Sequence, residues 1–312
     1  MTALPRQARG VRDSKWFPLV WIAPTAVVVV LLTIVAARLF RDSATGGAFF
    51  ADYPGLSPMP GWAPAGIPGW LAWQHGINAF LMVFIVKSGW LVRTTQRPPM
   101  YWTRRSTGPI RATGNPTKMS IHLWLHVATD TLWVVNGAVF YVLLFTSGQW
   151  ARIVPTSWDV FPNAASAAVQ YASLDWPTEN GWVGYNGLQL LTYFVIVFFV
   201  TPLSILTGVR MSPSWPKRSD RINQLFPIEL ARRLHFPLMI AFVAFVVVHV
   251  ALVFATGALR NLNHMYASHD GLGWTGFWVF VSTVIVTAAA WIALRPMTLR
   301  AIASTMGNVT RG

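Results

Sequence analysis

The sequence predicts an all-α integral membrane protein with six transmembrane helices. Its 312 residues are 54% hydrophobic and only 11% charged, whereas roughly a quarter of the residues in a soluble domain are charged. Six apolar runs reach the roughly 18 to 20 residues that cross a bilayer. Many of the 17 Trp fall near the ends of these runs, as in an aromatic belt. Because lipid cannot satisfy an open backbone, such runs indicate helices.

The predicted helices follow one another along the chain, at residues 17–40, 70–92, 119–146, 184–209, 232–257 and 274–294. The first run is too long for the apolar part of a signal peptide, and no small-residue cleavage site follows it, so we expect a true helix.

We expect a single membrane domain over residues 1–312. Residues 1–69 would form a cytoplasmic tail, the first helix and an outer loop. Residues 70–258 would form a four-helix core. Residues 259–312 would form an outer loop, the last helix and a second cytoplasmic tail.

Loop charge predicts the orientation of the chain. The net charge is +14, which in a soluble protein would suggest nucleic acid. Here it indicates basic cytoplasmic loops that can contact anionic lipid, with no nucleic-acid partner. Of the 24 Lys and Arg, 19 fall on one side: Arg6, Arg9, Arg12, Lys15, Arg93, Arg97, Arg104, Arg105, Arg111, Lys118, Arg210, Lys217, Arg218, Arg221, Arg232, Arg233, Arg295, Arg300 and Arg311. Six of the ten acidic residues fall on the other: Asp42, Asp52, Asp159, Asp175, Glu179 and Asp270.

The positive-inside rule therefore predicts a multi-pass protein of the inner (plasma) membrane with both termini in the cytoplasm. The chain has no Cys. That excludes disulfides, Cys-ligated iron–sulfur clusters and covalent haem attachment through a C-x-x-C-H motif.

Five of the seven His fall inside predicted helices: His75, His122, His126, His235 and His249. Imidazole at membrane depth is costly and is usually functional. Residues 234–249 read LHFPLMIAFVAFVVVH, with a His near each end of an apolar stretch. At 100° and 1.5 Å per residue, His235 and His249 share one helix face and lie about 21 Å apart along the axis. This spacing predicts two separate sites, one near each membrane surface.

The predicted topology supplies a partner for each of these histidines. His75 would lie in the outer half with His249, and His126 or His122 would lie in the inner half with His235. Two axial imidazoles are the ligands of a low-spin b-type haem, and iron without an open position serves electron transfer. The alternatives are His residues that hydrogen-bond between helices, or a transporter or metal permease with intramembrane His. A metal pathway would need further carboxylates or thiols, and Asp130 is the one acidic residue in the six runs.

Residues 70–258 resemble a family of bacterial membrane cytochromes b. The pieces that carry the resemblance are WQHGINAFLMVFIVKSG, YNGLQLLTYFVIVFFVTPLSILTG and RRLHFPLMIAFVAFVVVH, in this order. They are similar to cytochrome b subunits of the cytochrome b561, nickel-hydrogenase, formate dehydrogenase gamma and thiosulfate reductase type. One departure is an extra helix at each end of the core, so the side on which a partner docks does not carry over.

The resemblance implies two noncovalent haem b groups with His75, His126, His235 and His249 as axial ligands of the iron, and His122 as the alternative inner ligand. It also implies electron transfer between membrane quinone or quinol and a catalytic partner subunit, which in some relatives is a molybdopterin oxidoreductase. We find no catalytic nucleophile, acid–base pair or nucleotide loop, so we expect an electron-transfer subunit with no catalytic residue of its own.

Several other polar side chains and glycines have a structural or a functional interpretation. Asp130 either orients His126 or carries quinone protons, or makes a polar contact with a neighbouring helix. Lys87 is expected to extend its amine to the membrane surface. His264 and His269 are expected to be exposed loop residues. Arg232 and Arg233 either bind haem propionates or only set the topology. Helical glycines allow close approach of a helix or a porphyrin: Gly76, Gly89, Gly137 and Gly208.

Overall fold

The computed structural model describes residues 17, 19–105, 116–176, 181–212, 215 and 220–312. Several charged residues used in the topology prediction lie outside the described residues: Arg6, Arg9, Arg12, Lys15, Arg111, Glu179, Lys217 and Arg218. The chain divides into two compact units. The first holds the described parts of 1–57, 157–178 and 186–189, and the second those of 58–156, 179–185 and 190–312.

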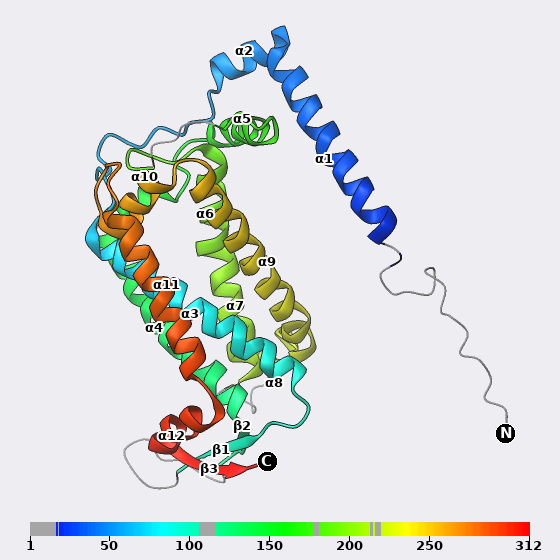
Figure 1. Cartoon of the computed structure of the whole chain (residues 1–312), viewed down its shortest axis with the longest axis vertical. Helices are drawn as coiled ribbons and strands as arrows, with labels where there is room; N and C mark the ends of the chain where they lie inside the picture. The colour runs from blue at the N-terminus through cyan, green and yellow to red at the C-terminus, as the bar shows by residue number, and fades with distance from the viewer. Residues whose placement is uncertain (1–16, 18, 106–115, 177–180, 213–214, 216–219) are drawn as a thin grey trace, which may run out of the picture. The chain divides into compact units, whose positions relative to one another are not determined.

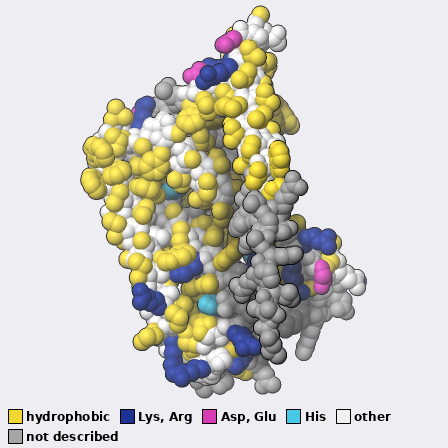
Figure 2. Space-filling model, turned by 45° about the vertical axis from the view of Figure 1, so that its right-hand side comes forward, with side chains coloured by type: hydrophobic (Ala, Val, Ile, Leu, Met, Phe, Trp, Pro, Cys, Tyr) yellow, Lys and Arg dark blue, Asp and Glu magenta, His cyan; other side chains and the backbone are white. Residues whose placement is uncertain are grey.

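Six helices among the described residues are long and apolar enough to cross a membrane, which confirms the predicted fold class. They are α1 (Leu19–Asp42), α3 (Gly69–Thr94), α4 (Ile121–Thr146), the continuous segment Gly187–Met211, α9 (Ile228–Ala255) and α11 (Thr275–Ala293). Each begins and ends within a few residues of its predicted run. Hydrophobic side chains dominate the visible face of the helices in Figure 2, as expected of surfaces that meet lipid.

The second unit carries the core helices. In Figure 1, α3 and α4 run side by side, and α7 and α9 do the same. Trp133 on α4 donates from Nε1 to Oδ1 of Asn78 on α3 at 2.6 Å. Helix α11 packs against α3, where the Lys87 amine donates to the carbonyl of Trp291 at 3.1 Å and lies 4.0 Å from that ring centre. Lys87 thus reaches the last turn of α11, which fixes this additional helix to the core.

The fourth span is interrupted by a π-helical turn. It consists of α6 (Gly187–Val195), the π-helix η3 (Ile196–Val200) and α7 (Thr201–Met211). Pro202 has no N–H to donate, and the amide of Thr201 bonds to Ile196 O, five residues back. This register frees the carbonyl of Val197, which accepts a hydrogen bond from the Tyr141 hydroxyl of α4 at 2.5 Å. The carbonyl left unpaired by the irregular turn therefore receives a hydrogen bond from a neighbouring helix.

A small sheet not anticipated from the sequence covers one end of the second unit. Strands β1 (Met100–Arg104), β2 (Met119–Ser120) and β3 (Gly307–Arg311) pair antiparallel in the order β2-β1-β3. The short helix α12 (Pro296–Met306) packs beside it, and Trp102 donates from Nε1 to Ala303 O at 3.0 Å. The buried cluster beneath joins sheet, α4 and α12: Met100, Trp102, Ile121, Trp124, Leu125, Leu299 and Ala303.

The remaining short elements of the second unit are the 3-10 helix η2 (Gln149–Arg152), α8 (Asp220–Leu225), α10 (Ala258–Leu262) and the π-helix η4 (Asn263–Ala267).

The first unit joins α1 to α2 (Ala44–Asp52) and α5 (Val160–Ala172). Asn163 on α5 accepts the amide of Gly55 at 2.9 Å, and Ser166 donates to the Tyr53 carbonyl at 2.6 Å. Near the end of α1, Arg41 pairs with Asp175 at 2.5 Å and donates to the Ser173 hydroxyl at 2.8 Å. These polar contacts account for the packing of a short amphipathic helix within a unit that has little apolar core.

Candidate functional site

Four of the five helix-borne histidines meet in two pairs. The ring centres of His75 and His249 are 6.3 Å apart, and those of His126 and His235 are also 6.3 Å apart. His75 lies near the start of α3 and His249 near the end of α9, whereas His126 and His235 lie near the starts of α4 and α9. We call His75 and His249 the outer pair, and His126 and His235 the inner pair, after the membrane sides that the loop charges predict.

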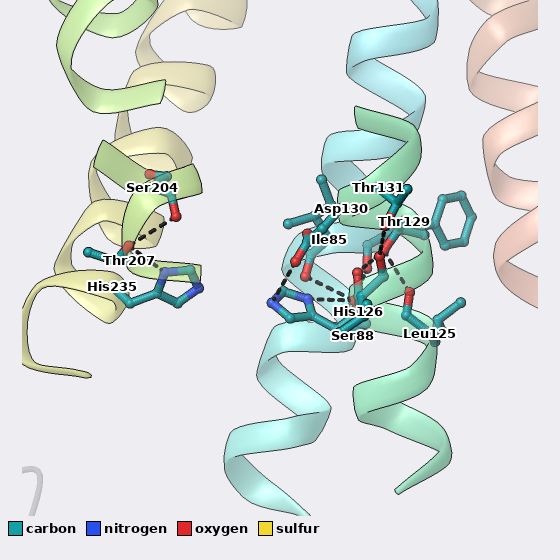
Figure 3. A network of polar contacts seen from close by, with 12 residues as sticks. Ile85, Ser88, Leu125, His126, Thr129, Asp130, Thr131, Ser204, Thr207 and His235 are labelled. Carbon is teal, nitrogen blue, oxygen red and sulfur yellow. Dashed lines mark hydrogen bonds and ion pairs between the residues drawn. The ribbon is translucent and has the colours of Figure 1, made fainter. Parts of the chain in front are cut away.

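The inner pair is placed by two hydroxyl side chains. Ser88 Oγ on α3 lies 3.0 Å from Nδ1 of His126, and Thr207 Oγ1 on α7 lies 2.9 Å from Nδ1 of His235. Figure 3 shows the two rings directed toward one another from their separate helices. Asp130, one turn after His126, places Oδ2 3.5 Å from Nε2 of that ring. This contact agrees with the interpretation in which Asp130 orients the His126 ring, rather than the one in which it contacts a neighbouring helix.

His122, the alternative inner residue, lies one turn before His126 on α4. Its Nδ1 is buried and has no hydrogen-bond partner among the described residues. The ring in contact with His235 is that of His126. The position along α4 explains this difference. His126 lies level with Ser88 of α3 and contacts it, whereas His122 lies one turn earlier.

The outer pair is surrounded by aromatic rings. Tyr266 meets His75 edge-on with ring centres 5.5 Å apart, and Tyr193 meets His249 at 6.1 Å. Phe245 stacks on His249 at 5.5 Å. Nδ1 of His75 is buried without a hydrogen-bond partner in the described part of the chain. The periodicity of α9 indicates Phe245, four residues before His249 on the same face, but nothing in the sequence marks Tyr266, which lies in a predicted loop.

Comparison with known proteins identifies the family. The family model described as prokaryotic cytochrome b561 matches residues 66–268, well over half of the chain. The chain belongs to the prokaryotic cytochrome b561 family. A relative from Azospira oryzae, named a putative protein-methionine-sulfoxide reductase subunit YedZ1, is 27% identical over 199 residues, which cover 60% of this chain and 88% of the relative. No solved structure matches the chain.

The family confirms the predicted resemblance and makes the protein a multi-pass membrane cytochrome of the b type, an electron-transfer protein that binds haem b. The side chains present in this cytochrome fit such a group. A metal bonded to two imidazoles at about 2 Å from each nitrogen separates the ring centres by about 6 Å, and both pairs have this separation. In the described residues, no group of three or more His, Cys, Asp or Glu lies close enough together to hold a metal ion.

The loop after α9 of this cytochrome corrects one expectation. His264 is only 3% exposed, not an exposed loop residue, and its Nε2 lies 2.8 Å from Oδ1 of Asp270. Arg260 binds both carboxylate oxygens of Asp270, at 2.6 and 2.8 Å. Asn263, also buried, bonds to the carbonyls of Gly271 and Gly273 and folds the loop back over His264. His269 is exposed, as predicted.

Asp270 is the charge centre of this loop. The Arg260 guanidinium, and then the His264 ring, hold the pKa of its carboxyl well below the usual range. Tyr266, which contacts His75, lies in the same π-helical turn η4 as His264. The ion-paired loop therefore supports one wall of the outer pair.

Arg152 is a second polar anchor that the sequence did not reveal. Its side chain is 2% exposed, and it donates to the carbonyls of Gly66, Gly181 and Trp182 at 2.8 to 3.1 Å. Burial lowers the pKa of its guanidinium, and the nearby Tyr185 side chain partly offsets this shift by raising it. Arg232, by contrast, is exposed on α9, as is Arg233.

Proposed function

We propose that this protein is a dihaem b-type cytochrome that transfers electrons between membrane quinone and a catalytic partner subunit. One observation carries the proposal: two histidine pairs with the same ring separation occupy two levels of one helical core. His75 and His249 would hold the outer haem, and His126 and His235 the inner haem, with His122 as the alternative inner ligand. A haem in each pair supplies a one-electron carrier at each side of the membrane.

The side chains of the core would do three things for these carriers. The four histidines would hold the iron of the two haems, and such ligation would make each haem an electron carrier rather than a site for substrate. Tyr193, Phe245 and Tyr266 pack on the outer ligands, and such packing excludes water and fixes the rings. The helices α3, α4, α7 and α9 set the distance between the two levels.

The catalytic partner subunit is proposed from the similarity of this chain to other cytochromes. The Azospira relative is named as a putative protein-methionine-sulfoxide reductase subunit. The family resemblance implies that some related cytochromes accompany molybdopterin oxidoreductases. We therefore propose a molybdopterin enzyme as the catalytic partner. The loop charges support a protein of the inner membrane with both termini in the cytoplasm and basic loops at the anionic lipid surface.

The test is haem quantitation on the full chain purified from a host with sufficient haem. We expect two haem b per chain, and reduction of both by a soluble quinol analogue in proteoliposomes. His249→Ala should lower the content to about one haem, whereas His269→Ala, at an exposed His, should leave two. A colourless wild-type protein would sink the proposal and favour the transporter alternative. Copurification from the native membrane identifies the partner subunit.

A further inference from the structure

A hydroxyl residue followed by glycine faces each inner histidine. Ser88 and Gly89 lie on α3 opposite His126, and Thr207 and Gly208 lie on α7 opposite His235. Both hydroxyl residues are fully buried. The two halves of the inner site thus repeat one arrangement on different helices, which indicates a common requirement (Figure 3).

The hydroxyl hydrogens are already committed to the backbone. Ser88 donates to the Phe84 carbonyl at 2.6 Å, and Thr207 lies 2.9 Å from the carbonyl of Leu203. A hydroxyl has one hydrogen but two acceptor lone pairs. Each oxygen can therefore only accept from the ring, so Nδ1 of His126 and of His235 carries the proton. Each Nε2 then keeps its lone pair for a metal, because Asp130 Oδ2, at 3.5 Å from Nε2 of His126, is too distant for a strong hydrogen bond to that nitrogen.

The glycines let the rings reach these hydroxyls. A Cβ on Gly89 would lie 3.1 Å from Cε1 of His126, and one on Gly208 would lie 3.5 Å from Cε1 of His235. Any side chain at Gly89 would push the ring away from Ser88. The close approach of ring and helix and the hydrogen bond thus depend on one another.

The outer pair has no such arrangement. Nδ1 of His75 is buried without a partner, and no hydrogen bond to the His249 ring occurs among the described residues. The difference matters because a ligand imidazole that donates its other N–H becomes more basic and a better donor to the metal. Better donation stabilises the ferric state over the ferrous state and lowers the midpoint potential.

We propose that Ser88 and Thr207 are positioning residues of the inner haem: they fix the Nδ1–H form of His126 and His235 and lower the midpoint potential of that haem alone. This inference rests on the dihaem function proposed above. Neither hydroxyl touches the metal, so the effect passes entirely through the two imidazoles.

The test is a redox titration of the purified full chain, with the inner haem assigned from His249→Ala, which retains it alone. Thr207→Val removes the hydroxyl and keeps the shape, and Ser88→Ala removes the other. We expect each to raise the inner midpoint potential and leave the outer one unchanged. A tenfold loss of ferric preference equals about 59 mV for one electron. Thr207→Ser should restore the wild-type value.

Thr129→Val is the matched control, because Thr129 is also buried and donates to backbone carbonyls of its own helix, those of Leu125 at 2.8 Å and His126 at 3.0 Å, rather than bonding to an imidazole. We expect no shift from it. If the wild type holds two haems and neither Ser88→Ala nor Thr207→Val moves the inner potential, the inference is wrong although the proposed function stands. Loss of the inner haem from Thr207→Val supports the inference if Thr207→Ser retains it and overturns it if Thr207→Ser loses it too. A wild type without haem refutes the proposed function itself.

Discussion

The inner and outer histidine pairs have the same ring separation but are held by different chemistry. Each inner ring has a buried hydroxyl at Nδ1, whereas the outer rings are enclosed by Tyr193, Phe245 and Tyr266. Hydrogen bonds fix a ring's rotation and its tautomer, while aromatic packing fixes only its position. The inner site should therefore respond to the loss of a single polar atom, and the outer site to the loss of a ring or of the loop that carries it.

The largest expected effect separates the two levels. His235→Ala should remove the inner haem and leave about one haem per chain, because the outer pair lies at the opposite end of α9. Haem quantitation and the reduced-minus-oxidised spectrum measure this.

His126→Ala should match His235→Ala, and His122→Ala should retain two haems. Loss of the inner haem from His122→Ala, but not from His126→Ala, would make His122 the ligand. Equal loss of both haems from His235→Ala would contradict the pairing in levels.

The second effect tests the close approach at the inner pair. Gly89→Ala should displace the His126 ring and cost about 1 to 3 kcal/mol, as overpacking does, and it should lower the haem content of the inner level. Gly208→Ala leaves more room and should cost less. Thermal retention of each haem's absorbance measures both.

Gly47→Ala on α2 is the control, since a Cβ there meets nothing within 4 Å and α2 carries none of the four histidines. It should be neutral or slightly stabilising because Ala favours the helix. An equal loss in all three variants would mean that the ring contact plays no part.

The sequence predicted the features that depend on one helix at a time. Six helices followed from apolar length, and the separation of His235 from His249 followed from the helix period. The resemblance to the cytochrome family is confirmed, while the assignment of the four histidines as iron ligands stays a prediction, as does the membrane orientation.

What escaped prediction depends on distant parts of the chain. Strand β1 pairs with β3 about two hundred residues later, so no local pattern marks either strand. His264 is buried because Asn263 folds a loop back over it. Ser88 and Gly89 stood in a recognised stretch, but their contact with His126 requires the packing of α3 on α4. Tyr266 reaches His75 only through the π-helical turn η4.

The third effect concerns the aromatic enclosure. Tyr266→Leu removes the edge-on contact with His75, which is worth about 0.5 to 1.5 kcal/mol beyond its buried area. Retention of the outer haem should fall by about 2- to 10-fold, and the inner haem should be unaffected. Tyr266→Phe keeps the ring and should behave as wild type. A change at the inner haem in Tyr266→Leu would argue that the two levels are not independent.

The smallest effect comes from the ion-paired loop beside the outer pair. The pKa of Asp270 is depressed in the folded protein by Arg260 and His264, so its contribution is present above the unfolded pKa of about 3.9 and is lost as the pH falls below that value. Acidification below about pH 4 should therefore loosen the loop and lower the melting temperature of the outer haem's absorbance before that of the inner haem. Asp270→Asn should lower the outer melting temperature already at pH 7 and respond less to acid.

Asp42→Asn removes another exposed carboxylate and should reproduce the wild-type profile. The effect of Asp270 is small because exposed ion pairs contribute little on their own. It reaches the outer pair at all because His264 and Tyr266 share the turn η4, so that a loop fixed at Asp270 holds a ring against His75. An acid profile in which both haems melt together would show that the loop does not support the outer site. The outer site would then be enclosed by its aromatic rings without support from the loop at Asp270.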